Sequence, residues 1–231
     1  MELKTLFLDA GGVLVVPNWA RVAGTLGRHG VDVAGSVLAR AEMRAKRQLD
    51  AEFKGRLPEA RPNGWAYFDL VLDHAGVPRT AAVDAAYADL RDYDARWNLW
   101  EDVPAGVAPA LERLRALGLK LAVVSNTNGT LRTLLGRVGL APRIDLVVDS
   151  FEEGVEKPDP LLFRIALDKA GARAESTVHV GDLFHVDVVG ARAAGLRAVL
   201  LDADDLSPDC DCPRVRSLDD LADRLRDGAL F

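Results

Sequence analysis

Residues 6–14 read Leu-Phe-Leu-Asp-Ala-Gly-Gly-Val-Leu, an apolar run that ends in a carboxylate and passes at once into two glycines. The run 6–8 is typical of a short buried strand, so Asp9 follows directly at its end. Gly11 and Gly12 permit a tight turn in which backbone N–H groups can approach an anion. Two interpretations are open at this point: a turn-forming Asp, or a carboxylate nucleophile beside an anion-binding loop.

The rest of the chain alternates between short apolar runs and stretches with helical spacing. Residues 107–117 carry apolar side chains at the spacing of one helix face and end at Gly118, a helix stop signal. This alternation predicts an α/β fold with a Rossmann-like, doubly wound parallel sheet. The further expected strands are 121–124, 146–148, 178–180 and 198–201.

A long segment without a convincing strand separates the first expected strand from residue 107. From Trp19 to Trp97 it is rich in Ala, Arg and Leu and favours helices, with breaks at Pro58, at 62–64 and at 76–78. We therefore expect an all-helical domain of residues 17–97 inserted into a core made of residues 1–16 and 98–231.

Composition limits the classes of function. The 231 residues are 49% hydrophobic and 28% charged, as in ordinary globular proteins, and the formal net charge of −6 argues against binding to nucleic acid. There is neither an apolar run long enough to span a bilayer nor a signal-peptide pattern, so we expect a cytoplasmic protein with no membrane partner. Cys210 and Cys212 are too few for a disulfide framework and lack the spacing of a zinc site, which favours a reduced pair.

Polar residues follow several of the expected strands, and parallel strands bring their carboxyl ends to one edge of the sheet. Ser125 and Asn126 follow the second strand, where they could donate hydrogen bonds to a phosphate. Asn126, Thr127 and Asn128 could equally cap a helix that begins near Thr130. Ser150 stands near the end of the third strand.

Lys157 lies in the run Glu-Lys-Pro-Asp-Pro at 156–160. A single Lys is ordinarily a solvated surface residue. Here Pro158 and Pro160 restrict the backbone around it, which favours a fixed cation that could hold carboxylates and phosphate together.

Residues 179–187 place two acids, Asp182 and Asp187, just after the fourth strand. Carboxylate oxygens suit Mg²⁺, which usually takes one or two carboxylates together with phosphate and water. Asp187 could alternatively be an acid at a helix N-terminus, where the helix dipole favours it. His179 and His185 are interpreted as structural residues, because the expected metal prefers oxygen ligands.

Taken in order, these features resemble the four motifs of the haloacid dehalogenase (HAD) superfamily. A strand-terminal Asp, a strand-terminal Ser, a Lys before Pro and a Gly-Asp segment with a second acid occur at Asp9, Ser125, Lys157 and Asp182 with Asp187. The resemblance covers the chain outside the helical insertion, which is similar to the cap domain of many members.

The resemblance implies a role for each of these residues. Asp9 would be the nucleophile and a Mg²⁺ ligand, Ser125 would bind phosphoryl oxygens, and Lys157 would orient Asp9 and offset charge. Asp182 would hold Mg²⁺, with Asp187 assisting. The remaining residues of the implied site are the backbone carbonyl of Gly11 as a metal ligand, and Gly11, Gly12, Asn126 and Lys157 as substrate-binding positions.

One position departs from the family pattern. Phosphatases of this superfamily usually carry a second Asp two residues after the nucleophile, which protonates the leaving group and then activates water. This chain has Gly11 there. General acid–base catalysis contributes about 10² to 10⁴ in rate, so its loss should slow hydrolysis of esters with poor leaving groups the most.

In the inserted domain, Arg40, Arg44 and Arg47 share a helix face, which fits either a solvated surface or contact with an anionic substrate. Trp65 and its neighbours Tyr67 and Phe68 are interpreted as core residues of that domain.

The sequence predicts a Mg²⁺-dependent phosphatase for a small phosphorylated metabolite, as a monomer or homodimer, acting through an aspartyl-phosphate on Asp9. Two alternatives stay open: a catalytically weak phosphate-binding or regulatory protein, and a dehalogenase-like carbon–halogen hydrolase.

Overall fold

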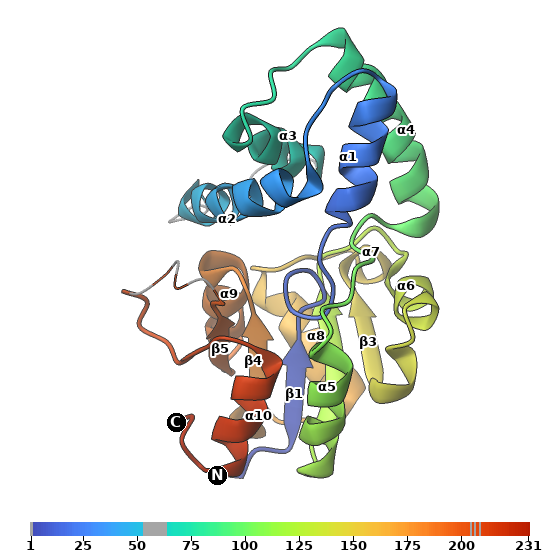
Figure 1. Cartoon of the computed structure of the whole chain (residues 1–231). Coiled ribbons are helices and arrows are strands. Elements are labelled where there is room, and N and C mark those ends of the chain that lie inside the picture. Colours follow the sequence, from blue (N-terminus) through green and yellow to red (C-terminus); the bar gives the residue numbers. More distant parts are fainter. Residues whose placement is uncertain (1, 53–63, 204, 206, 208) are drawn as a thin grey trace. The chain divides into compact units, whose positions relative to one another are not determined.

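A six-stranded, fully parallel sheet organises the computed structural model, which describes residues 2–52, 64–203, 205, 207 and 209–231. The strand order is β3-β2-β1-β4-β5-β6. Figure 1 shows this sheet with helices α5 and α10 in front of it. The strands are β1 (Thr5–Leu8), β2 (Lys120–Ser125), β3 (Leu146–Asp149), β4 (Thr177–Gly181), β5 (Arg197–Leu201) and β6 (Arg214–Val215).

The helices alternate with these strands. In the described part of the insertion between β1 and β2 the helices are α1 (Trp19–Arg28), α2 (Gly35–Glu52), α3 (Gly64–His74) and α4 (Ala81–Trp97). The others are α5 (Val107–Ala116), α6 (Leu131–Arg137), α7 (Ser150–Glu153), α8 (Pro160–Ala170), α9 (Val189–Ala193) and α10 (Leu218–Arg226). Short 3₁₀ turns cover Ala141–Arg143 and Ala174–Ser176, and a π-helical turn covers Phe184–Val188.

Packing against the sheet accounts for the α/β architecture. One face is covered by α8 and α9, whose buried Phe163 and Ala191 meet sheet residues such as Phe7 and Val124. Strands buried on both faces read as continuous apolar runs, as β1 and β2 do. Each fully buried Leu, Val or Phe side chain stabilises the fold by roughly 1.5–3 kcal/mol relative to an exposed one.

The strand order determines where a ligand can bind. The chain winds outward from β1 through β2 to β3, and then from β4 through β5 to β6 on the other side. The switch point of this doubly wound sheet is therefore between β1 and β4, where ligands bind at the carboxyl ends of the strands. Asp9 and Asp182 follow these two strands directly.

Contacts divide the chain into two compact units, Met1–Val16 with Glu101–Phe231, and Pro17–Trp100. The chain leaves the first unit after Val16 and returns to it at Glu101. The two segments run side by side there, because the Val16 and Asp102 backbones exchange N–H···O bonds of 2.8 and 3.2 Å. The described residues of the second unit are folded into helices α1 to α4 and their connections, and they have their own core, which includes Trp19, Leu38 and Tyr87.

A buried carboxylate organises the core of the helical unit. Glu42 on α2 is 8% exposed and accepts hydrogen bonds from Trp19 Nε1 at 2.8 Å and from the Tyr67 hydroxyl at 2.6 Å. Lys46 Nζ lies 3.5 Å from the same carboxylate. Phe68 is buried and partners the rings of Trp19 and Trp65, as expected for core aromatics.

The expected α/β class with a parallel sheet and a helical insertion is confirmed. All five predicted strands and the helix ending before Gly118 are present, within a few residues of their predicted bounds. The two-residue strand β6 was not predicted, because a segment this short has no detectable periodicity. The predicted breaks at Pro58 and at 62–63 lie outside the described residues.

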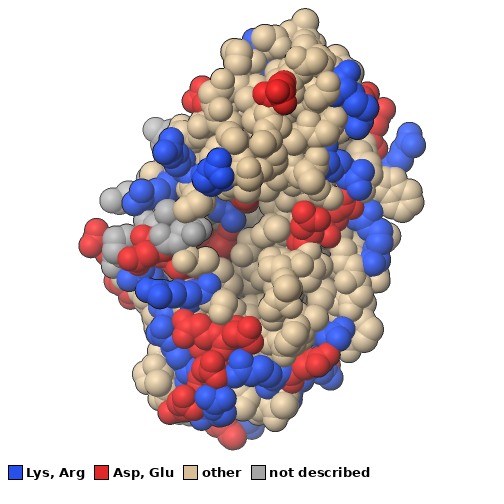
Figure 2. Space-filling view, in the orientation of Figure 1, with Lys and Arg blue, Asp and Glu red and all other residues tan. Residues whose placement is uncertain are grey.

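Charged side chains of both signs share the surface. Figure 2 shows Lys and Arg interleaved with Asp and Glu over α5 and α10, where Arg113 pairs with Asp219 at 2.9 Å and Arg226 with Asp223 at 3.0 Å. No helix in the described part of the chain has the length and apolar character needed to cross a membrane.

Glu42→Ala is predicted to destabilise the helical unit by about 2 kcal/mol, because the buried Trp19 N–H would lose its acceptor. Glu42→Gln retains one acceptor oxygen and should lose about half as much. Denaturant unfolding followed by Trp fluorescence measures this unit specifically, since all four Trp residues lie between 19 and 100. Equal stability of both variants and the wild type would contradict the assigned bonds.

Candidate active site

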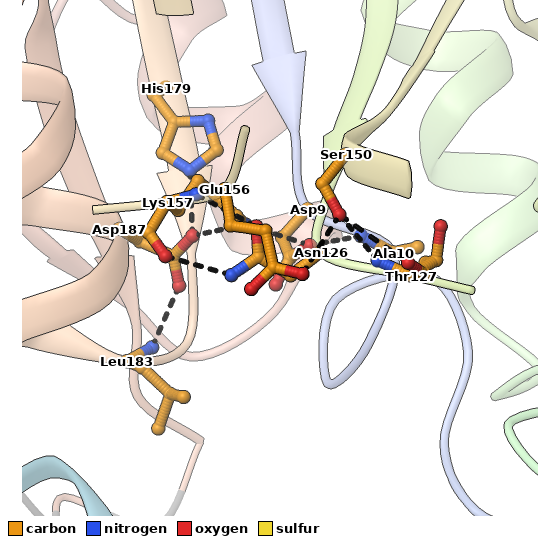
Figure 3. Close-up of polar contacts among 10 residues, drawn as sticks. All are labelled: Asp9, Ala10, Asn126, Thr127, Ser150, Glu156, Lys157, His179, Leu183 and Asp187. Atoms are coloured by element: carbon orange, nitrogen blue, oxygen red, sulfur yellow. Dashed lines mark hydrogen bonds and ion pairs between the residues drawn. The ribbon is translucent and has the colours of Figure 1, made fainter. Parts of the chain in front are cut away.

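The carboxyl end of the sheet gathers the polar residues that the sequence singled out. Asp9 follows β1, Ser125 ends β2 and Asp182 follows β4, so packing of the strands alone brings them to one edge. Asp9 is 9% exposed and Ser125 is 2% exposed. Figure 3 shows the polar contacts around Asp9, Lys157 and Asp187.

Asp9 is held in place by the backbone of its own turn and of β4. Its N–H donates to the Val180 carbonyl at 2.9 Å, and its Oδ1 accepts from the Ala10 N–H at 2.8 Å. The turn then closes on itself, as Gly12 N–H donates to the Val15 carbonyl at 2.8 Å. The carboxylate therefore has a fixed direction before any ligand binds.

Gly12 allows a close approach that other residues would block. Its φ is +73°, and a Cβ at this position would lie 1.9 Å from Asp182 Oδ2. The turn after Asp9 thus packs directly against the Asp182 carboxylate, which explains the requirement for Gly at this position.

Lys157 reaches the site because two segments hold its backbone. The Asn126 side chain accepts from Lys157 N–H at 2.8 Å and donates to the Lys157 carbonyl at 2.9 Å. Beyond it, Gly190 on α9 lies so close to Pro158 that a Cβ there would be 2.9 Å from Pro158 Cα. A larger residue at Gly190 would therefore collide with the loop that carries Lys157.

The ammonium group of Lys157 lies between two carboxylates. Its Nζ is 2.9 Å from Asp9 Oδ1 and 2.6 Å from Asp187 Oδ1, and the side chain is 1% exposed. Burial by itself would lower the pKa of Lys157, but the charges of Asp187 and Asp9 outweigh it and raise the pKa to about 12. The group therefore carries its positive charge at neutral pH.

Asp187 is fully buried, and its two oxygens accept three hydrogen bonds. Oδ1 receives Lys157 Nζ at 2.6 Å and His179 Nε2 at 2.9 Å, while Oδ2 receives the Leu183 N–H at 3.1 Å. Burial would raise the pKa of Asp187, but the Lys157 charge and then the His179 hydrogen bond hold it well below its ordinary value. The residue is thus an ionised carboxylate bound by cationic and neutral donors.

Asp9, Asp182 and Asp187 together form an acidic cluster, with one ligand oxygen from each lying within 4.8 Å of the others. Lys157 offsets only part of this negative charge. Hard oxygen donors with an excess of negative charge match the needs of a divalent cation such as Mg²⁺. The structure therefore brings together the three predicted acids of the site and Lys157.

The other residues singled out from the sequence lie outside this acidic cluster. The Asn126 amide binds the backbone of Lys157, so the interpretation of Asn126 as a helix cap is wrong. At the start of α6, Asn128 Oδ1 accepts from the Thr130 N–H at 3.3 Å and Asp149 Oδ2 accepts from the Leu131 N–H at 3.4 Å. His179 is a buried residue that contacts Asp187. Cys210 and Cys212 are free thiols whose Sγ atoms lie 3.5 Å apart. In the helical unit, Arg40, Arg44 and Arg47 are exposed on α2.

Two positioning contacts were not found from the sequence. Ser150 Oγ accepts from the Thr127 N–H at 3.1 Å and lies 3.5 Å from Glu156 Oε1, so it joins the loops after β2 and β3. His179 contacts the second acid of its own motif. The only sequence signal for His179 is a titratable residue inside an otherwise apolar strand.

Comparison with known proteins agrees with this geometry. The family model for haloacid dehalogenase-like hydrolases matches residues 3–195, so the chain belongs to the HAD-like hydrolase family. Haloacid dehalogenase-like hydrolase domain-containing protein 3 of Mus musculus is 33% identical, over 87% of this chain and 82% of that protein.

Some relatives are phosphatases. Ribulose-1,5-bisphosphate 5-phosphatase of Halopiger xanaduensis is 36% identical over 60% of this chain, and phosphoserine phosphatase of Thermus thermophilus is 40% identical over 58%. The matched regions span 57% and 53% of those two proteins, respectively.

Solved structures share the fold. The HAD-hydrolase YfnB of Bacillus subtilis, a magnesium-bound structure, superposes with a TM-score of 0.70 at 18% identity, covering 97% of this chain and 99% of that one. A 2-haloacid dehalogenase of Pseudomonas syringae gives 0.60 at 26% identity, covering 98% and 100%.

Gly12→Ala is predicted to lower the free energy of unfolding by about 3 kcal/mol, because it adds a clash with Asp182 to an unfavourable left-handed backbone. Gly118→Ala is the matched control: its φ is +80° with nothing within 4 Å of the added Cβ, so it should lose only about 1 kcal/mol. Urea denaturation of both variants measures the difference. Equal losses would contradict the close approach of Gly12 and Asp182.

Proposed function

We propose that this protein is a Mg²⁺-dependent phosphohydrolase that uses Asp9 as a covalent nucleophile on a small phosphorylated metabolite. The observation that carries the proposal is the buried Lys157 ammonium, 2.9 Å from Asp9 Oδ1, beside the acidic cluster that includes Asp182. Support for a phosphoryl substrate comes from the phosphatases of Halopiger xanaduensis and Thermus thermophilus to which the chain is similar.

In this mechanism the Asp9 carboxylate attacks phosphorus, the ester oxygen leaves, and water then cleaves the aspartyl-phosphate to release phosphate. Lys157 keeps one Asp9 oxygen fixed by a hydrogen bond and offsets charge that develops on the phosphoryl oxygens. Ser125, with Asn126 and the backbone of Gly11, would contact the phosphoryl group at the end of the sheet, whereas the Gly12 N–H already donates to the Val15 carbonyl.

The acidic cluster fits a divalent cation, since three carboxylates share one Lys charge. Asp9, Asp182 and the Gly11 carbonyl would hold Mg²⁺, with Asp187 behind them, and the bound ion would supply a positive charge to the phosphoryl oxygens. Both oxygens of Asp187 already accept hydrogen bonds from the protein. We therefore assign it an indirect role at the metal.

Gly11 determines which esters this site hydrolyses well. No side chain at residue 11 can protonate the leaving oxygen or activate water, so turnover should favour acyl and aryl phosphates, whose leaving groups need little protonation. Residues 17–97 would act as the cap that excludes water from the reaction, as in cap-bearing members of the family.

The two alternative functions make different predictions. A phosphate-binding or regulatory protein would bind phosphate and Mg²⁺ without turnover. A dehalogenase would need no metal, and the 26% identity with the Pseudomonas syringae enzyme keeps this alternative worth testing with a chelator. The acidic cluster around Asp182 favours the metal-dependent reaction.

Asp9→Asn is predicted to abolish Mg²⁺-dependent phosphate release from aryl and acyl phosphates, because the amide cannot form the acyl-phosphate. Asp202→Asn is the matched control: Asp202 is also a buried Asp that follows a strand, but it bonds Arg214 and the Ser207 N–H instead. The control should retain activity within a few-fold. Turnover that survives in Asp9→Asn would rule out the covalent mechanism, and turnover of a haloacid in EDTA would support the dehalogenase.

Gly11→Asp is predicted to raise kcat/KM for alkyl phosphates by about 10- to 100-fold and to change aryl phosphates much less, since only poor leaving groups need protonation. The backbone at Gly11 lies outside the left-handed region, so a side chain there needs no strained conformation. The ratio of alkyl to aryl rates in the two proteins measures the effect. An unchanged ratio in a folded variant would show that residue 11 does not limit the reaction.

A further inference from the structure

His179 is a polar residue in a position that otherwise takes apolar side chains. It lies in β4 between Val178 and Val180, is 0% exposed, and pairs in register with Phe7 of β1 and Ala198 of β5. Its ring and the Phe163 ring of α8 form a T-shaped pair, with centroids 4.9 Å apart and planes at 74°. Burying an imidazole here costs free energy that a Val or Leu would not.

One hydrogen bond offsets part of that cost. The Asp187 carboxylate can only accept, so His179 Nε2, 2.9 Å from Oδ1, carries the proton and donates it. Among the described residues, Nδ1 is buried with no hydrogen-bond partner. Within the described residues, the imidazole therefore makes one polar contact, to Asp187. A buried group that is only half satisfied calls for an explanation beyond packing.

The contact fixes the carboxylate that holds Lys157. Asp187 Oδ1 receives His179 from one side and Lys157 Nζ from the other, while Oδ2 is held by the Leu183 N–H. With donors on both oxygens, the carboxylate cannot rotate without breaking a buried hydrogen bond. Lys157 in turn lies 2.9 Å from Asp9 Oδ1, so the chain of contacts runs from His179 through Asp187 and Lys157 to Asp9 (Figure 3).

We propose that His179 is a positioning residue for the reaction: its Nε2–H fixes Asp187, which places the Lys157 ammonium against the nucleophile Asp9. The inference rests on the proposed function for its catalytic consequence, but the placement of Lys157 is independent of turnover. Partners that orient the groups of an active site typically contribute 10- to 100-fold to activity.

A purely structural His179 would have different consequences. It would stabilise β4 and the packing of α8, and any replacement that restored stability would restore function. If His179 positions Asp187, activity requires an N–H donor where Nε2 lies, and a variant without that donor loses activity even if it is stable. Gln places an amide N–H near that point, whereas Leu fills the space without a donor.

The test compares His179→Leu and His179→Gln with Val178→Ala, which truncates a buried neighbour in the same strand without touching Asp187. Steady-state kinetics on an aryl phosphate with Mg²⁺ gives kcat and KM separately. We expect kcat to fall about 10- to 100-fold in His179→Leu with KM within 3-fold, and to recover to within about 5-fold of the wild type in His179→Gln. Val178→Ala should retain the wild-type kcat below its unfolding temperature.

A second measurement needs no turnover. Hydrogen exchange of the Lys157 ammonium, followed by proton–nitrogen NMR of the ¹⁵N-labelled protein, should be slow because its donors are buried against Asp9 and Asp187. Lys157→Met identifies the signal by its loss. The signal should disappear or broaden in His179→Leu and persist in His179→Gln and Val178→Ala.

Loss of the signal and of kcat in His179→Leu, with recovery in His179→Gln, supports the positioning role. A protected Lys157 signal in His179→Leu would overturn it, and so would equal losses of kcat in all three variants, which would indicate a general effect on folding. If the wild type shows no turnover, the proposed function fails, and the NMR comparison alone decides whether His179 places Lys157.

Discussion

The ammonium group of Lys157 is the contact on which the rest of the site depends. It lies between the carboxylates of Asp9 and Asp187, 2.9 and 2.6 Å away, and is almost completely buried. Carboxylates this close to one another would repel and would bind protons if they were buried without a cation. A charge that stays on Lys157 keeps Asp187 ionised, and Asp9 can present a carboxylate oxygen at the edge of the sheet.

The fold supplies this contact by bringing distant segments together. Lys157 is held by Asn126 on one side and closely packed against α9 on the other, where Gly190 leaves room for Pro158. Gly12 does the same for the turn after Asp9, which packs directly against Asp182. At Gly12 and Gly190 the missing side chain matters because it lets neighbouring segments pack in close contact.

The two units have separate structural tasks. The sheet unit holds the residues of the candidate site at the ends of parallel strands, around β1 and β4. The helical unit has its own core, including a carboxylate, Glu42, whose hydrogen bonds stay within that unit. A mutation in one core should therefore alter the stability of its own unit first, because the main hydrophobic contacts of each are internal.

The sequence by itself determined the strand ends, the parallel sheet, the helical insertion and the order of Asp9, Ser125, Lys157 and Asp182, because periodicity and motif spacing are local properties. Only the tertiary structure decided the partners of these residues. Asn126 and Lys157 are 31 residues apart, and Lys157 and Asp187 are 30 apart. His179 has no sequence pattern that reveals its task, since its contact with Asp187 arises when the π-helical turn Phe184–Val188 places that carboxylate beside β4. Such contacts depend on packing between elements, which no local pattern specifies.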